Sequence, residues 1–229
     1  MKPRVSHQKT AALTLVEVFV VIVVLFVLAA LLLPALSRPH KDTWRSLCVN
    51  NLKQIDLSYR FWADDHNGKY PFEISVTDGG TMELNNALAN FLVISNNLGT
   101  PKLLICPSDT DRVAATDFTT GFSAKNTSYF VGLDAGTNHP KTFVSGDDNF
   151  AISGIPVKSG LLEFSSNAPI AWTAARHGGS YQPNLWTPMK SYILGNIGLA
   201  DGSVQITSPQ LLQQAVQNTG VATNRLAIP

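Results

Sequence analysis

The chain has 229 residues, of which 45% are hydrophobic and only 14% are charged. A typical globular domain carries about 25% charged residues, so this chain is poor in charge. The 17 basic and 16 acidic residues leave a net charge of +1, which argues against nucleic-acid binding through bulk electrostatics. Two cysteines are too few for a disulfide-built scaffold or a cysteine-rich zinc site. Composition leaves a membrane-associated or exported single-domain protein.

The N-terminus combines a basic leader with an apolar run. Residues 1–12 contain three basic side chains and no acid, and residues 13–36 are almost entirely apolar. A helix over this run would be about 36 Å long, enough to cross a hydrocarbon core of about 30 Å. The segment is therefore predicted to insert in a membrane. Three interpretations compete for it: a cleaved secretory signal, a plain membrane anchor and a prepilin-type segment.

Glu17 is the one feature that the first two interpretations do not explain. A carboxylate at the centre of a membrane costs about 2–3 kcal/mol, and less near its edge. If the chain is cut between Ala12 and Leu13, the new amino group lies four residues before Glu17. The two opposite charges could then pair between neighbouring subunits, which would remove the cost of both.

Residues 12–18, with the sequence ALTLVEV, resemble the class III prepilin signal of type IV pilins and type II secretion pseudopilins. The usual glycine and phenylalanine at the cleavage site are replaced by Ala12 and Leu13. The resemblance implies that a prepilin peptidase cuts between these two residues and methylates the amino group of Leu13. It also implies that Glu17 acts in assembly, and Pro34 falls where many pilins have a proline that kinks the helix.

Residues 37–66 are predicted to form a stalk helix. Apolar residues recur at spacings of three and four, which is typical of one buried helix face. This stripe consists of Cys48, Leu52, Ile55, Tyr59 and Trp62. Asp56 and Arg60 are expected on the exposed surface of the helix, which should end near residues 64–68.

Residues 67–229 change to short apolar runs separated by turn-forming residues. Asp201 and Gly202 between two apolar runs predict a β-hairpin over residues 195–207, and residues 210–217 are expected to be helical. The predicted fold is α+β and pilin-like, with a long N-terminal transmembrane and stalk helix packed on a C-terminal antiparallel β-sheet with long loops. The domains are a leader (1–12), a transmembrane helix (13–36), the stalk (37–66) and an exported β-rich domain (67–229).

Further motifs resemble the pilin-like proteins abundant in planctomycetes and verrucomicrobia, which carry a C-terminal His-to-Asp-Gly motif. They lie at residues 48–54, 63–71, 106–109, 176–179 and 196–204. The histidine and the Asp-Gly pair correspond to His177 and Asp201, separated here by an apparent insertion at 180–195. Because Cys48 and Cys106 recur beside these motifs and the domain should be exported, a disulfide between them is favoured over two buried free thiols.

No cofactor is predicted. Three acidic clusters invite a calcium site, but none has the spacing of an EF-hand. These clusters are Asp109 with Asp111, Asp147 with Asp148, and Asp64 with Asp65 and Asn67. The chain has no Gly-x-Ser-x-Gly elbow and no His-Glu-x-x-His pair, so no catalytic residue is assigned and the protein is not expected to be an enzyme.

The predicted function is that of a structural subunit of a type IV pilus-like or type II secretion filament. Its implied partners are a prepilin peptidase, other pilin-like subunits and an inner-membrane assembly platform, with no nucleic acid. The expected location is the inner membrane, crossed once with the C-terminal domain outside, and then the filament. The alternative is an anchored periplasmic domain that binds a ligand such as a glycan through exposed Trp172, Trp186 and Tyr181.

Overall fold

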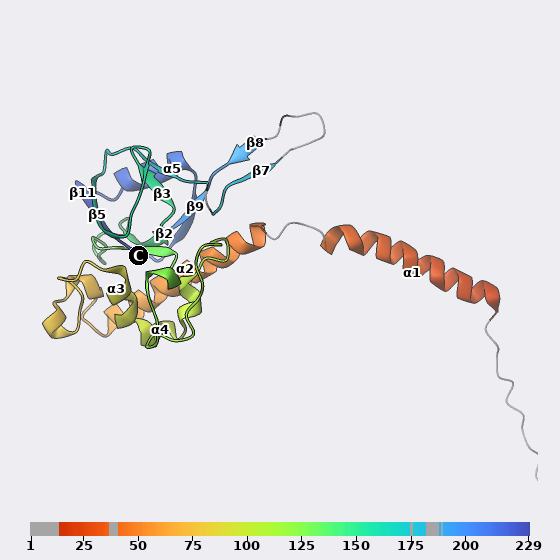
Figure 1. Ribbon diagram of the computed structural model, residues 1–229, viewed down its shortest axis with the longest axis horizontal. Helices are drawn as coiled ribbons and strands as arrows, with labels where there is room; N and C mark the ends of the chain where they lie inside the picture. Colours follow the sequence, from red (N-terminus) through yellow and green to blue (C-terminus); the bar gives the residue numbers. More distant parts are fainter. Residues whose placement is uncertain (1–13, 37–40, 175, 182–187, 189) are drawn as a thin grey trace, which may run out of the picture. The chain divides into compact units, whose positions relative to one another are not determined.

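The computed structural model (Figure 1) describes residues 14–36, 41–174, 176–181, 188 and 190–229. It describes the side chains of all of these residues except 31–36, 41, 42, 180, 181 and 190. The chain divides into two compact units, Met1–His40 and Lys41–Pro229. The helices and 3-10 turns (η) are α1 (Leu15–Leu36), α2 (Lys41–Asp64), η1 (Pro71–Glu73), η2 (Val76–Asp78), α3 (Ala87–Val93), α4 (Ser95–Leu98), η3 (Pro101–Leu104), η4 (Ala124–Asn126) and α5 (Pro209–Gln217). The strands are β1 (Tyr129–Gly132), β2 (Phe143–Asp147), β3 (Phe150–Ile152), β4 (Ile155–Pro156), β5 (Gly160–Ser165), β6 (Ile170–Trp172), β7 (Gly179–Tyr181), β8 (Lys190–Tyr192), β9 (Gly195–Leu199), β10 (Val204–Thr207) and β11 (Thr223–Ile228).

The first unit contains α1. The structure of this unit contradicts the prediction of a membrane-spanning helix. Among the described residues, no helix combines the length and the apolar character needed to cross a membrane. The transmembrane helix over 13–36, the membrane part of the pilin-like fold class and the single-pass inner-membrane location are therefore wrong on this finding.

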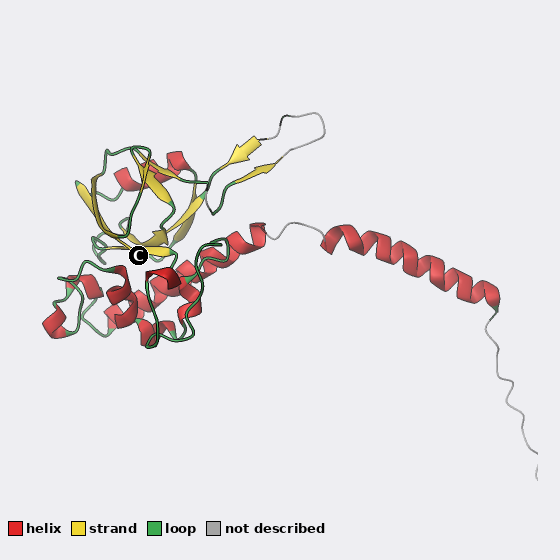
Figure 2. Cartoon of the chain, viewed as in Figure 1, coloured by secondary structure: helices red, strands yellow, loops and turns green. Residues whose placement is uncertain are grey.

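The second unit is built on a six-stranded antiparallel sheet with strand order β10-β9-β2-β1-β11-β5. Figures 1 and 2 show α2, α3 and α4 gathered on one side of this sheet, with α5 on the other side. Successive side chains of a strand point to opposite faces. Tyr129 and Val131 of β1 accordingly join the core beneath α2, whereas Phe130 between them joins the core beneath α5.

Helix α2 packs against this sheet through the predicted stripe. All five of its residues are buried: Trp62 is 7% exposed, and no surface is exposed on Cys48, Leu52, Ile55 and Tyr59. The helix ends at Asp64, where Asn67 and Gly68 adopt positive φ angles that an α-helix cannot continue through. The predicted buried stripe and the predicted end of the helix are confirmed, with one correction. Asp56 was expected on the surface, but it is only 2% exposed and faces the sheet, where it contacts Ser145 of β2.

The remaining secondary structure follows the local signals in part. β9 and β10 pair as the hairpin expected around Asp201 and Gly202, where Gly202 has φ +85°, and α5 covers residues 209–217. The segment between α2 and β1 differs from the expected β-rich texture, because its described residues form only helices and turns. Within the apparent insertion, β7 and β8 form a separate two-stranded hairpin.

Candidate functional site

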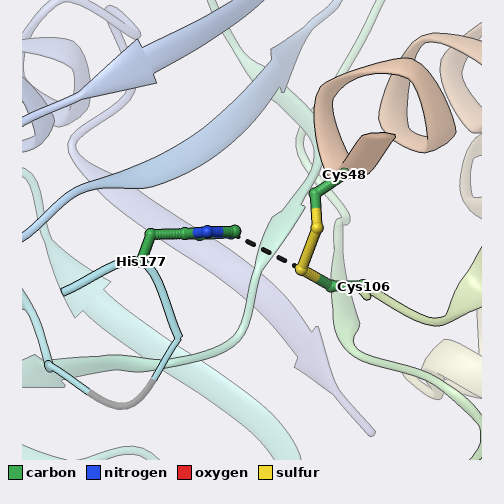
Figure 3. Close-up of side chains that lie close together, drawn as sticks. All are labelled: Cys48, Cys106 and His177. Carbon is green, nitrogen blue, oxygen red and sulfur yellow. Dashed lines mark hydrogen bonds between the residues drawn. A yellow bond between two sulfur atoms is a disulfide. The ribbon is translucent and has the colours of Figure 1, made fainter. Parts of the chain in front are cut away.

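A disulfide lies at the junction between α2 and the rest of the second unit (Figure 3). Cys48 of α2 is bonded to Cys106, which follows η3 and precedes a proline turn. Both cysteines are fully buried, and they are 58 residues apart in sequence. The bond therefore ties the stalk helix to the segment that leads into β1.

His177 reaches the same point from the loop between β6 and β7, and Figure 3 shows its imidazole directed at the disulfide. Its Nε2 atom lies 3.5 Å from Cys106 Sγ, 3.1 Å from Asn196 Nδ2 and 3.3 Å from Asp147 Oδ2. His177 is 5% exposed. Its carboxylate neighbour is therefore Asp147, and not the Asp201 of the sequence motif. Asp201 instead accepts a hydrogen bond from the backbone of its own turn.

Asp147 and Asn196 sit on the neighbouring strands β2 and β9 and complete this cluster. The Oδ2 atom of Asp147 accepts hydrogen bonds from the backbone N–H of Asn196 at 2.8 Å and from its Nδ2 at 2.9 Å. Both residues are fully buried. The other carboxylate oxygen, Oδ1, has no hydrogen-bond partner among the described atoms, nor does Oδ1 of Asn196. An unpaired buried carboxylate oxygen is unfavourable, so this cluster is under-satisfied.

A buried ion network lies beside the cluster. Arg176 pairs with Asp109 at 2.7 Å and also with Asp148, and it donates to the carbonyl oxygen of Ser128 at 2.6 Å. Arg112 adds a second guanidinium 2.5 Å from Asp148. These carboxylates belong to two of the acidic clusters considered for calcium, and here arginine side chains supply the positive charge instead.

The pKa values of Asp148 and Arg176 are both raised, but for different reasons. Burial raises the pKa of Asp148 above the usual carboxyl range, although the charges of Arg176 and Arg112 act against this rise. Burial lowers the pKa of Arg176, but the carboxylates of Asp148, Asp147 and Asp109 outweigh burial and the pKa is raised. Arg176 therefore stays charged at any ordinary pH, and the network is a permanent ionic brace.

A cavity of about 280 Å³ opens beside His177 and Arg176, and its other lining residues are mostly polar or aromatic. They are Trp44, Arg45, Ser108, Thr110, Ala174, Gly178 and Tyr192. A second cavity, of about 220 Å³, borders Arg112 and Asp148. The ion network thus lies between two cavities, and the first cavity gives access to the imidazole of His177.

A further buried carboxylate, that of Asp56 in α2, was not predicted from the sequence. Its Oδ1 accepts a hydrogen bond from Ser145 Oγ at 2.5 Å, and its Oδ2 has no partner among the described atoms. Gly198 of β9 lies so close that an added Cβ would sit 1.9 Å from Oδ2. Burial raises the pKa of Asp56 to about 7, while Ser145 and the charge of Arg60 oppose the rise. A glycine inside a strand was the available signal for such a close approach.

In the first unit, Glu17 belongs to a capping box at the start of α1. Its Oε2 accepts hydrogen bonds from the backbone N–H of Thr14 at 2.7 Å and from its hydroxyl at 2.9 Å, and Glu17 N–H donates back to Thr14 Oγ1 at 3.3 Å. These bonds lower the pKa of Glu17. Ala12 and Leu13 lie outside the described residues. Pro34 falls in the last turn of α1, two residues before its end, so the predicted kink is not tested.

Of the three aromatic residues of the ligand-binding alternative, only Trp172 has a described side chain, and it is not exposed. Trp172 is 3% exposed and donates its Nε1–H to Thr207 Oγ1 at 3.0 Å, so it belongs to the core. Trp186 and the side chain of Tyr181 lie outside the described part of the chain. The structure therefore gives this alternative no support at Trp172, its only described member.

Comparisons of the chain with known protein families, with curated proteins and with solved structures found no match. The resemblance to prepilins therefore stays a prediction from the sequence.

Proposed function

We propose that the chain is a structural subunit of a pilus-like or type II secretion-like filament, assembled through α1. The observation that carries the proposal is the exposure of this helix. Its large apolar side chains from Leu15 to Leu28 are between 44% and 85% exposed. Contiguous apolar surface of this kind is unfavourable in water and marks a site of association.

The distribution of these side chains favours several neighbours over one. A helix that packs against a single partner carries an apolar stripe on one face, whereas a helix that is apolar all round is buried on all sides. From Val18 to Ala30, α1 has no polar side chain on any face. Equivalent helices of other copies, packed around it in the interior of a filament, would cover its whole circumference.

Glu17 fits this proposal as a residue that sets the register of each subunit. In the single chain its carboxylate caps α1 through Thr14 and lies at the helix N-terminus, where a negative charge is favourable. After cleavage between Ala12 and Leu13 and methylation of the new terminus, the terminal amine of a neighbouring subunit would provide a positive partner. The proposed partners are a prepilin peptidase, other pilin-like subunits and an assembly platform.

Cysteine crosslinking in cells tests the assembly through α1. Both native cysteines are in the disulfide, so a single introduced cysteine supplies the reactive thiol. Phe26→Cys places it on α1 and Val113→Cys places it on the second unit, and the parent side chains are 73% and 74% exposed. A bis-maleimide should convert the Phe26→Cys chain to covalent dimers and leave the Val113→Cys chain largely monomeric. Equal dimer yields from the two variants would overturn the proposal.

A further inference from the structure

Three side chains with metal-binding atoms meet at the disulfide between α2 and the sheet. Cys48, Cys106 and His177 each offer one ligand atom, and these atoms all lie within 4.8 Å of one another. Asp147 lies against the same imidazole nitrogen. We propose that the reduced form of the chain binds one Zn²⁺ here, held by the two thiolates, His177 Nε2 and a carboxylate oxygen of Asp147. The disulfide and the metal are then alternative occupants of one buried site.

The distances around His177 match those of a tetrahedral zinc site. Bonds of about 2.3 Å to sulfur, 2.05 Å to nitrogen and 2.0 Å to oxygen place sulfur and nitrogen about 3.6 Å apart, and nitrogen and oxygen about 3.3 Å apart. The structure has Nε2 at 3.5 Å from Cys106 Sγ and at 3.3 Å from Asp147 Oδ2. Two edges of the tetrahedron are thus already formed. The sulfurs must part to about 3.8 Å once their bond is broken.

An independent observation on Asp147 also points to a cation. Its side chain is fully buried and its Oδ1 has no hydrogen-bond partner among the described atoms. Arg176 is near enough to feel its charge, but the ion pairs of that guanidinium go to Asp109 and Asp148. A metal ion would supply the missing positive partner. Asn196 Nδ2, which is 3.1 Å from Nε2, gives up that contact when the nitrogen binds zinc.

The two states interconvert by ordinary thiol chemistry. A dithiol reductant gives two electrons and two protons to the Cys48–Cys106 bond and becomes a disulfide itself, leaving two thiols. Binding of Zn²⁺ then releases the two thiol protons, because the metal binds thiolates. The cavity beside His177 provides a route to the site, and folding in the presence of the metal provides another.

The test uses the full chain, unfolded with a dithiol reductant and refolded with Zn²⁺ while the reductant is kept. After removal of free metal, we expect about one zinc per reduced chain and none per oxidised chain. Co²⁺ in place of zinc should give the absorption of tetrahedral cobalt with bound thiolate. Equal zinc contents of the two forms would overturn the proposal. If the reduced chain does not fold without metal, zinc should restore its near-UV circular dichroism, and failure to do so would also overturn it.

Matched histidine variants separate a ligand from a bystander. His177→Ala should lower the zinc affinity of the reduced chain roughly tenfold or more while the oxidised chain still forms its disulfide. His139→Ala changes an exposed histidine and should bind zinc as the parent chain does. Asp147→Asn keeps the shape of the fourth ligand and should also weaken binding. Undiminished zinc binding by His177→Ala would refute the site.

Discussion

Replacing Asp56 by asparagine should remove a pH-dependent destabilisation of the second unit. The carboxylate is 2% exposed, and its pKa is raised from 3.8 to about 7, chiefly by burial. The folded state therefore holds the proton more tightly than the unfolded state does. The stability linked to Asp56 is fully present below about pH 4 and is lost as the pH rises to about 7.

The size of the effect follows from the shift. A pKa change of about 3 units corresponds to about 4 kcal/mol of unfolding free energy between the two ends of that pH window. Asparagine cannot ionise, but its amide would occupy the position of Oδ2, which has no partner, at a cost of about 1–3 kcal/mol. Asp56→Asn should therefore raise the free energy of unfolding by about 1–3 kcal/mol at pH 8, and lower it by about 1–3 kcal/mol at pH 4.

Urea unfolding followed by circular dichroism across this pH range measures the difference. Asp65→Asn serves as the control, because it changes an exposed aspartate just beyond the end of the same helix. The stability difference between Asp56→Asn and the parent chain should change sign between about pH 4 and pH 8, while the control should show no such change. A difference that stays constant over the range would refute the reasoning.

Three further predictions concern the brace, the disulfide and the cap. Changing Cys48 and Cys106 together to serine should cost about 4 kcal/mol in urea unfolding without reductant, because a loop of 58 residues is opened; a loss below about 1 kcal/mol would contradict this. Arg176→Met should cost about 3–5 kcal/mol, because the buried carboxylates of Asp109 and Asp148 lose their buried guanidinium partner and keep only the partly exposed Arg112. Arg225→Met, which removes a more exposed ion pair with Asp134, should cost under about 1 kcal/mol, and similar losses in the two variants would argue against a brace. Glu17→Gln should keep the cap of α1 but impair assembly in the crosslinking assay, and normal crosslinking would show that the charge is not needed.

The sequence was informative where structure is decided locally. The spacing of three and four residues from Cys48 to Trp62 was enough to identify the buried face of α2. The Asp201-Gly202 pair located the β9–β10 hairpin, although only Gly202 adopts a positive φ in the observed turn. The apolar run at the N-terminus also formed a helix, but its length and apolar composition together led to the incorrect transmembrane prediction.

The buried polar groups could not be predicted in this way, because their surroundings come from distant parts of the chain. Asp56 sits beside the apolar stripe of α2, and its burial depends on Ser145, which is 89 residues later in sequence, and on Gly198. The helical pattern of α2 by itself predicted that Asp56 is exposed. Only the packing of α2 on the sheet determines that Asp56 is buried.

The partner of His177 could not be predicted from the sequence. The sequence motif contains both His177 and Asp201, but the structure brings Asp147 to the imidazole. Asp147 and Asp148 are adjacent, but they serve different groups: Asp147 contacts His177, and Asp148 pairs with Arg176. The sequence showed that Asp147 and Asp148 are adjacent, but it did not indicate that their side chains contact different partners.

Mass spectrometry of the N-terminus of the native protein tests the filament account most directly. The account predicts a chain that begins at Leu13 and carries one added methyl group, with Glu17 as its fifth residue. A chain that still begins at Met1, or one that begins after α1, would contradict it, because neither would place an amine where Glu17 can pair with it.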